Sequence, residues 1–329
     1  MKIMFFANDP GGANAITPLI EPLSKRHEVH VFAQLSALQI MKCKEYNNEL
    51  KDIMPDVLIT GTSARNLNER YLWQEAKKLG IKTVAFVEYW GYYGIRFSDV
   101  SVIDEPNFSG ECNMLPDYII VPDDYAKAEA IKERVPEELI YPLGNPHFID
   151  VYNKFQKAED IRSKFAKKDE FLITYASQPF IEDCGHGEEL NILDDILSLT
   201  DKKVIVKIHP KESFEKFEKY KNRVILDKTT PMEEVIKASD LVISINSIVL
   251  LEALIAGKPI ISYQKNEHDK NKFILTRFGY LPFITNKEDF AKELKNKIQN
   301  PEILQYNDFI KYDAIEIITN FIEERIWQN

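Results

Sequence analysis

The sequence has few cysteines, no long apolar run and no excess of positive charge. Its three cysteines, Cys43, Cys112 and Cys184, lack paired spacing in a chain of 329 residues, which predicts reduced thiols, a cytoplasmic protein and no zinc site. No apolar run approaches the roughly 20 residues needed to span a bilayer, so no membrane span is expected, although peripheral association stays open. The formal net charge of −10 argues against nucleic-acid binding, because a phosphate backbone requires clustered Lys and Arg.

The sequence does contain a regular alternation of short apolar runs and helix-forming stretches. This alternation predicts parallel sheets in an α/β protein, and Gly144-Asn145-Pro146 interrupts it between two halves. The expected domains are 1–146, 147–313 and a C-terminal helix, 314–329, that packs back on the first domain. The predicted strands are 2–7, 28–33, 56–60, 82–87, 117–121 and 139–143 in the first half, and 171–176, 203–208, 223–226, 241–243 and 259–262 in the second.

The stretch 240–263 predicts one β-α-β unit. A short apolar strand leads into Ser244, Asn246 and Ser247, and a helix follows for which Ser247 is the expected N-cap. Backbone N–H groups and hydroxyls at a helix N-terminus can bind a phosphate, and Glu252 could reach back to a ribose hydroxyl. An ordinary βαβ crossover with a capped helix explains the pattern equally well.

In the first half, two carboxylates directly follow predicted strands. Asp9 begins a turn that contains Gly11 and Gly12, which allow a ligand to approach the backbone closely. Glu88 begins an aromatic segment that ends at Arg96. Ligands of open α/β sheets bind beyond the carboxyl ends of strands, so both carboxylates are candidates. The alternatives are simple turn chemistry at Asp9 and aromatic packing after Glu88.

In the second half, His209 ends a predicted strand and precedes Pro210 and Lys211. An imidazole at the edge of a sheet can donate a hydrogen bond to a phosphate or protonate it as it leaves, and Lys211 would add positive charge. The alternative is a histidine bonded to local backbone. We favour a functional His209 because Ser244 and Ser247 are expected at the end of the next parallel strand.

Four segments match motifs of known families, namely Asp117-Tyr-Ile-Ile-Val-Pro-Asp-Asp-Tyr-Ala, Leu143-Gly-Asn-Pro-His-Phe-Ile-Asp, Val206-Lys-Ile-His-Pro, and Ser247 to Pro259 with its Glu-Ala-Leu-x-x-Gly-Lys-Pro end. They resemble segments of the UDP-N-acetylglucosamine 2-epimerase superfamily and of bacterial sialyl-, polysialyl-, Kdo- and glycerophosphate-transferases. The resemblance implies the GT-B architecture, in which two facing Rossmann-like domains with parallel sheets border an interdomain cleft. It also implies that the His-Pro element and the serines hold a donor nucleotide.

The sequence departs from the epimerases at their signature motifs. Their Gly-Thr-Arg-Pro-Glu after the first strand is replaced by Asn-Asp-Pro-Gly-Gly at 8–12, and their His-Gly-Asp-Thr by Thr-Gly-Thr-Ser at 60–63, which lacks the carboxylate. Phe86-Val87-Glu88 resembles their His-Val-Glu-Ala-Gly element, with the glycine and arginine displaced to Gly94 and Arg96. Because the acid and base groups are only partly present, these departures favour a transferase over an epimerase.

We therefore expect a metal-independent GT-B glycosyltransferase of polysaccharide biosynthesis that needs no cofactor. It would move a sugar from a nucleotide-activated donor, with the CMP-linked type among the candidates, to a glycan or other hydroxyl acceptor. Asp9 or Glu88 would deprotonate the acceptor, with Asp9 favoured because its glycine neighbours leave room. An epimerase or hydrolase of UDP-sugars and a nonenzymatic sugar-nucleotide-binding protein are the alternatives. His209 would act on the donor phosphate, and the expected donor-binding residues are Gly11, Gly12, Pro210, Lys211, Ser244, Asn246, Ser247 and Glu252.

Overall fold

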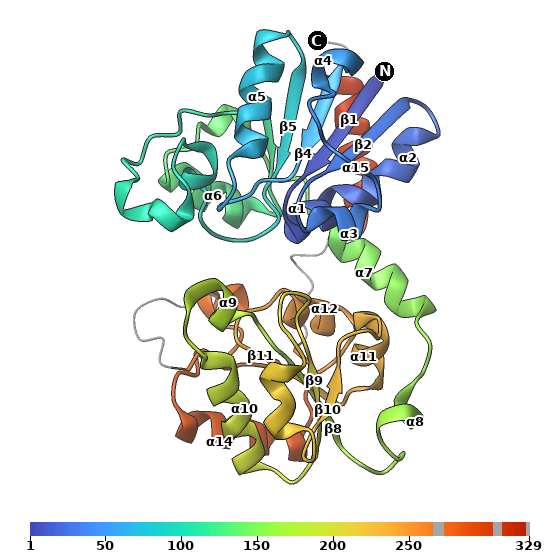
Figure 1. Ribbon diagram of the computed structural model, residues 1–329, viewed down its shortest axis with the longest axis vertical. Coiled ribbons are helices and arrows are strands. Elements are labelled where there is room, and N and C mark those ends of the chain that lie inside the picture. Colours follow the sequence, from blue (N-terminus) through green and yellow to red (C-terminus); the bar gives the residue numbers. More distant parts are fainter. Residues whose placement is uncertain (266–272, 305–310, 327–329) are drawn as a thin grey trace. The chain divides into compact units, whose positions relative to one another are not determined.

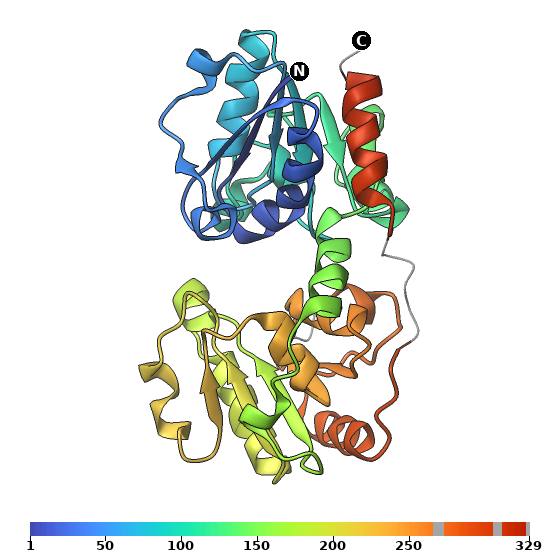
Figure 2. The ribbon, with the colours of Figure 1, turned by 90° about the vertical axis from the view of Figure 1, so that its right-hand side faces the viewer.

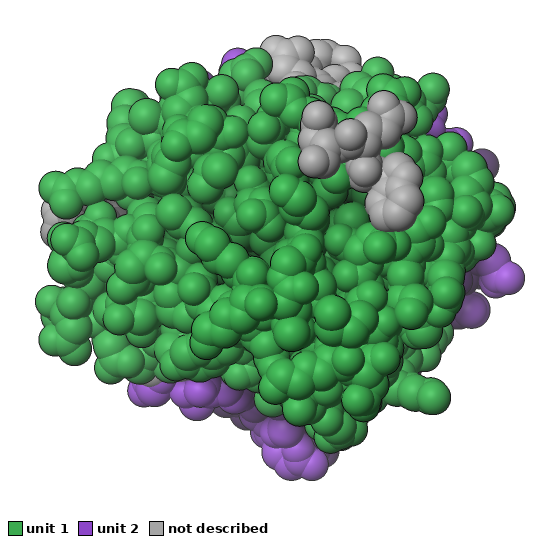
Figure 3. Space-filling view, turned by 90° about the horizontal axis from the view of Figure 1, so that it is seen from above, with its two compact units in different colours: residues 1–150, 308–329 green, residues 151–307 purple. Residues whose placement is uncertain are grey.

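Two separate parallel β-sheets organise the chain in the computed structural model, which describes residues 1–265, 273–304 and 311–326. The first sheet has seven strands in the order β3-β2-β1-β4-β5-β6-β7, and the second has five in the order β10-β9-β8-β11-β12 (Figure 1). Each sheet lies within one of two compact units, which Figure 3 shows in different colours. Unit 1 comprises Met1–Asp150 with Asp308–Asn329, and unit 2 comprises Val151–Asn307. The two boundaries between the units thus lie a few residues from the domain boundaries expected after residues 146 and 313.

The elements of unit 1 alternate strand and helix as the sequence pattern indicates. Helix α7 (Pro146–Lys157) crosses the division between the units. The others are β1 Lys2–Ala7, α1 Pro10–Ile16, η1 Thr17–Leu19, α2 Ile20–Ser24, β2 Glu28–Ala33, α3 Ala37–Met41, β3 Lys44–Glu45, α4 Leu50–Ile53, β4 Val57–Thr60, α5 Asn68–Lys78, β5 Lys82–Phe86, η2 Gly94–Phe97, η3 Val102–Asn107, β6 Tyr118–Ile120, α6 Asp124–Lys132, η4 Glu137–Leu139, β7 Ile140–Tyr141, α15 Ala314–Asn320 and η6 Phe321–Ile326.

The core of unit 1 lies on both faces of its sheet. β1 is buried on both faces because successive side chains alternate and both faces are covered by helices. On one face, α1, α2, α15 and η6 pack in a single apolar cluster, to which the C-terminal segment contributes Ala314, Ile318, Ile322 and Ile326. On the other face lies α5 (Figure 2), whose Trp73 indole donates a hydrogen bond to the Thr60 hydroxyl at 2.8 Å.

The first helix begins earlier than the sequence suggests. The turn residues at 8–14 predict a helix only from about Ala15, whereas α1 begins at Pro10, with Asp9 at the N-cap position. Proline suits the first position of a helix because its fixed φ is helical and its missing N–H would have no partner there. The side chain of Asp9 makes no capping hydrogen bond.

Unit 2 places its helices on both faces of a smaller sheet. One apolar cluster joins β8, β9 and β11 to α10 and α14, and a second joins the opposite face to α8 and α11. The elements are α8 Arg162–Phe165, β8 Leu172–Ala176, α9 Phe180–Cys184, α10 Glu188–Leu199, β9 Lys203–Lys207, η5 Glu215–Tyr220, β10 Ile225–Asp227, α11 Met232–Ala238, β11 Leu241–Ser244, α12 Val249–Ile255, β12 Ile260–Ser262, α13 Ile274–Arg277 and α14 Lys287–Gln299.

Strand order in unit 2 corrects one expectation. β9, which ends before His209, is not the neighbour of β11, because β8 pairs with both and lies between them. The predicted β-α-β unit is present, since β11 and β12 pair in parallel around α12. The residue at the N-cap position of α12 is Ile248 and not Ser247, although the Ser247 hydroxyl accepts a hydrogen bond from the Val249 N–H at 3.3 Å.

Two further expectations concern membranes and cysteines. Among the described residues, every helix is too short or too polar to cross a bilayer. Cys43 and Cys112 are free thiols, and burial raises the pKa of both. The side chain of Cys184 lies outside the described residues, as do residues 327–329 at the end of the expected C-terminal helix.

Candidate functional site

At the carboxyl edge of the unit 1 sheet, Glu88 is held by Arg96. The Arg96 guanidinium lies 3.2 Å from both oxygens of the Glu88 carboxylate and also donates to the Thr62 hydroxyl at 2.9 Å. That hydroxyl donates to the Phe86 carbonyl at 2.9 Å. β4 and β5 are adjacent, so the residues that follow them meet at one edge. The displaced Arg96 therefore orients Glu88, and Thr62 supplies a hydroxyl where the epimerase motif has a carboxylate.

Gly11 and Gly12 are needed for close packing at the same edge. A Cβ at Gly11 would lie 2.9 Å from both Cγ and Oε1 of Glu88. A Cβ at Gly12 would lie 2.8 Å from the Cα of Gly61, at the end of the neighbouring strand β4. The two glycines thus bring the start of α1 against Glu88 and the backbone of Gly61. This contact explains both residues without a ligand.

Glu69, which the sequence analysis missed, is fully buried beside Asp9. Its carboxylate accepts hydrogen bonds from the Asn8 backbone N–H at 3.1 Å and from the Asn8 side-chain amide. Burial, followed by the negative charge of Asp9, raises the pKa of Glu69 to about 7. A carboxyl group with this pKa exchanges protons near neutral pH, so Glu69, which is hydrogen-bonded to Asn8 at the end of β1, is a second candidate for proton exchange. No sequence signal marks Glu69, because acidic residues in the first turn of a helix are common.

In unit 2, Gln178 connects the ends of β8 and β11. Its side-chain oxygen accepts the Asn246 backbone N–H at 2.9 Å, and its amide nitrogen lies 2.7 Å from the Asn246 side-chain oxygen. Ser244 is fully buried, and its hydroxyl donates to the Ala176 carbonyl at 2.7 Å. Ser244 therefore joins two strands, and its hydroxyl is not positioned to contact a ligand. No local sequence signal marks Gln178, because its partner Asn246 lies 68 residues further along the chain.

His209 and Lys211 lie at the same carboxyl edge of the unit 2 sheet, after β9. The Lys211 N–H donates to Nδ1 of His209 at 3.2 Å, so in the neutral ring Nε2 carries the hydrogen. The His209 N–H donates to the Glu212 carboxylate at 2.9 Å, and the Ser177 hydroxyl donates to it at 3.0 Å. Glu212, which the sequence analysis did not single out, thus fixes the loops after β8 and β9.

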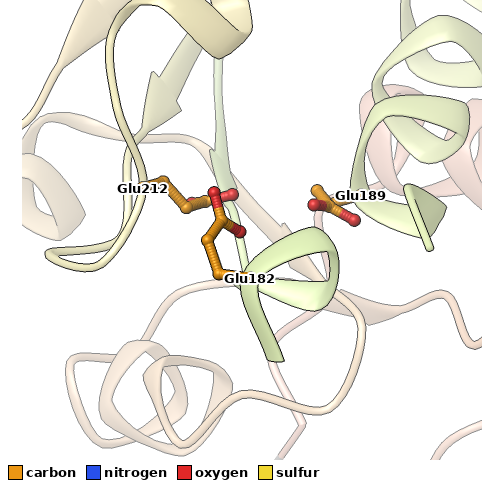
Figure 4. Close-up of side chains that lie close together, drawn as sticks. All are labelled: Glu182, Glu189 and Glu212. Carbon is orange, nitrogen blue, oxygen red and sulfur yellow. The ribbon is translucent and has the colours of Figure 1, made fainter. Parts of the chain in front are cut away.

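Glu212 belongs to a cluster of three carboxylates that resembles a metal site. Glu182 from α9, Glu189 from α10 and Glu212 from the loop after β9 converge within 4.8 Å (Figure 4). The Lys216 ammonium lies 2.9 Å from Glu182 and 2.6 Å from Glu212, and it also contacts Glu189. Burial opposes the charge of Lys216, but the hydrogen bonds that its ammonium donates to the carboxylates outweigh burial and raise the pKa of Lys216. The ammonium thus takes the place that a bound cation would occupy.

The remaining candidates of unit 2 lie nearby along the chain. Asn246 and Ser247 are half-buried after β11, and Glu252 is half-buried in α12. Pro210 is exposed beside His209. The structure thus gathers the candidates of unit 2 at the carboxyl ends of β9 and β11. Strand β8 lies between these two strands and contributes Ser177 and Gln178.

A basic hollow lies at the opposite edge of the same sheet, where β8 and β9 begin. Part of its charge is neutralised, since Asp240 pairs with Arg162 at 2.7 Å and Glu170 with Lys203 at 2.8 Å. Because parallel strands separate their two ends, this hollow is distinct from the site around His209. Its cationic lining consists of Arg162, Lys164, Lys167, Lys168 and Lys203.

Comparison with solved structures assigns the fold. UDP-GlcNAc 2-epimerase of Neisseria meningitidis bound to UDP-GlcNAc is 15% identical, with 99% of this chain and 100% of that chain covered and a TM-score of 0.69. The Methanocaldococcus jannaschii epimerase in complex with UDP-GlcNAc and UDP is 19% identical, with 98% and 99% covered and a TM-score of 0.70. MnaA of S. aureus with UDP is 17% identical, with 98% and 96% covered and a TM-score of 0.71. Neither a family model nor a curated protein matches the sequence.

These likenesses confirm the predicted fold class of two Rossmann-like α/β domains of the GT-B type. They contradict the main functional expectation. Two of the three matched proteins are named as UDP-GlcNAc 2-epimerases, so the prediction of a glycosyltransferase is wrong, and the specific transferase groups are not supported. The missing carboxylate at 60–63 favoured a transferase, but Glu88 and its partner Arg96 are present at the same edge of the sheet.

Proposed function

We propose that the chain binds a UDP-linked N-acetylhexosamine and acts on it as an epimerase or hydrolase that needs no acceptor. The proposal is supported by the likeness over nearly the whole chain to epimerases solved with UDP-GlcNAc or UDP. The observation that carries it is Glu88, which follows β5, is oriented by Arg96 at 3.2 Å and lies against Gly11.

In this proposal, Glu88 exchanges a proton with the sugar. Inversion of a ring carbon requires that a proton leave on one face and return on the other, so the site needs side chains that take and give protons. Glu88 is a better candidate than Asp9, because Arg96 and Thr62 hold its carboxylate in one position. Asp9 and Glu69 provide further carboxyl groups, and the pKa of Glu69 near 7 suits proton exchange.

The nucleotide is assigned to unit 2. His209 would donate from Nε2 to a phosphate oxygen, since its Nδ1 already accepts the Lys211 N–H. Asn246 and Ser247 provide polar groups after β11, and Gln178 and Glu212 position these loops. Lys211 adds positive charge and Glu252 remains the candidate for a ribose hydroxyl. Ser244 is left out because it is buried.

The experiment is incubation with UDP-GlcNAc in deuterated water without any acceptor. We expect release of UDP or formation of the 2-epimer, together with deuterium at the carbon that is inverted, detected by NMR and mass spectrometry. Glu88→Gln should slow this by roughly 10²- to 10⁴-fold, the usual contribution of a positioned acid or base, with UDP affinity nearly unchanged. His209→Ala should weaken UDP binding as well.

Glu75→Gln is the matched control, because it makes the same charge change on α5, where Glu75 pairs with Lys51 at 2.9 Å. Its turnover should equal that of the wild type. Binding of UDP-GlcNAc without UDP release or deuterium uptake would overturn the enzymatic proposal in favour of a nonenzymatic binding protein. If Asp9→Asn abolished turnover while Glu88→Gln retained it, Asp9 would be the base.

A further inference from the structure

The segment from Glu88 to Arg96 is a closed loop in which Tyr92 is the one aromatic residue that is largely exposed. The Arg96 side chain contacts the Glu88 carboxylate at 3.2 Å and donates from Nε to the Gly91 carbonyl at 3.3 Å. The guanidinium group of Arg96 therefore links the Gly91 carbonyl to the Glu88 carboxylate. Tyr92 follows Gly91 directly. Its backbone is therefore held near Glu88, the proposed proton-exchanging carboxylate.

Of the other aromatic residues of the loop, Trp90 and Tyr93 are buried, and Tyr89 is half-buried with its ring 6.2 Å from that of Trp90. Trp90 is buried, its indole donates to Asp123 at 2.8 Å, and its ring stacks on Phe148 with centroids 6.0 Å apart. Tyr93 is buried, and the next residue is anchored through its N–H to Glu133 at 2.9 Å. Tyr92 is 47% exposed. The loop is thus fixed on both sides of a ring that faces solvent.

The backbone at Tyr92 is strained. Its φ is +58°, in the left-handed region where a bulky side chain is unfavourable and where glycine would be preferred. Glycine stands one position earlier, at Gly91, and not at Tyr92. Such strain persists where the surroundings hold the backbone in place, and it concentrates at functional sites. The fixed flanks of this loop provide that constraint.

We propose that Tyr92 binds the sugar ring of the substrate, with its aromatic face against the C–H face of the pyranose. This inference rests on the proposed function, since it takes the sugar to lie at Glu88. A phenol ring offers an apolar face with a polar tip, which matches a pyranose that has an apolar face and hydroxyl groups at its rim. Tyr92 would thereby select for the sugar and not for the nucleotide.

Met54 provides a matched control. It is also a large apolar residue with positive φ, +46°, and it is 48% exposed. It follows α4 and precedes β4, so it lies at the amino-terminal edge of the same sheet, away from Glu88. Replacement of either residue by glycine relieves backbone strain, but only the replacement of Tyr92 should weaken binding of the sugar.

The experiment compares wild type, Tyr92→Gly, Tyr92→Phe and Met54→Gly. Melting temperatures and dissociation constants for UDP and for UDP-GlcNAc are measured on the full chain. Both glycine variants should melt at or above the wild-type temperature. Tyr92→Gly should bind UDP as the wild type does but bind UDP-GlcNAc roughly 3- to 10-fold more weakly, the range of one aromatic contact. Tyr92→Phe and Met54→Gly should retain both affinities.

Wild-type affinity of Tyr92→Gly for UDP-GlcNAc would refute the role of Tyr92 and leave the proposed function intact, provided that the wild type releases UDP. Equal loss of UDP and UDP-GlcNAc affinity would also refute it, since the contact would then not be to the sugar. A wild-type protein that binds neither ligand would overturn both proposals.

Discussion

Asn8 donates hydrogen bonds from both its backbone N–H and its side-chain amide to the buried carboxylate of Glu69. Through this pair, helix α5 holds the residue that precedes Asp9, so the position of the turn after β1 depends on a group in another element. Because the charge of Asp9 contributes to the raised pKa of Glu69, a substitution that removes this charge should lower the pKa of Glu69.

Stability should depend on pH through Glu69. Its pKa is raised to about 7 in the folded chain from an ordinary value of 4.5. The folded state therefore binds more protons than the unfolded state between these values, so the free energy of unfolding falls as pH rises through this window, by at most about 3 kcal/mol. In Glu69→Gln this loss should disappear. Urea denaturation on either side of the window measures it, and parallel pH profiles for the two proteins would contradict the prediction.

The two glycines of α1 should respond differently to alanine. In Gly12→Ala the new Cβ meets backbone at 2.8 Å, which cannot move cheaply, so the free energy of unfolding should fall by about 1 to 3 kcal/mol. In Gly11→Ala it meets the Glu88 side chain at 2.9 Å, which can turn away. Gly11→Ala should therefore fold normally but release UDP from UDP-GlcNAc more slowly. Equal stability of the two variants would show that the Gly12 contact relaxes.

Gln178 should control nucleotide affinity. Gln178→Glu keeps the oxygen that accepts the Asn246 N–H at 2.9 Å, but it adds a negative charge to the proposed phosphate site. We expect UDP affinity to fall on the order of tenfold, with the melting temperature little changed, as measured by calorimetry and thermal melting. Gln299→Glu, at the end of α14, makes the same charge change on the surface and should bind UDP normally. Equal UDP affinity in both variants would show that the phosphate does not bind beside Gln178.

Removal of the Lys216 cation should destabilise unit 2. Lys216→Met leaves the buried carboxylates of Glu189 and Glu212 without their counter-ion, which should cost about 3 to 5 kcal/mol in urea denaturation. Lys219→Met, one turn away and exposed, should cost about 0.5 kcal/mol or less. If Mg²⁺ or Ca²⁺ raised the melting temperature of the wild type but not of a Glu189→Gln variant, the cluster would bind a metal and Lys216 would not be its resident cation.

The sequence by itself determined the elements whose signals are local. β11, α12 and β12 were predicted from an apolar run, small polar residues, a helical run and Gly257-Lys258-Pro259. These signals are local because hydrogen-bond patterns and turn conformations depend on neighbouring residues. The alternation of such units also fixed the parallel α/β class, since a parallel strand pair requires a crossover.

Only the tertiary structure decided which strand ends meet. The sequence placed His209 beside Ser244, whereas β8 lies between their strands and supplies Gln178. It likewise gave no sign that Glu69 is buried against Asn8 or that Glu212 holds the His209 N–H. Strand order and the burial of a carboxyl group depend on the packing of whole helices against a sheet, which joins residues far apart in the chain, and local residue patterns carry no record of those contacts.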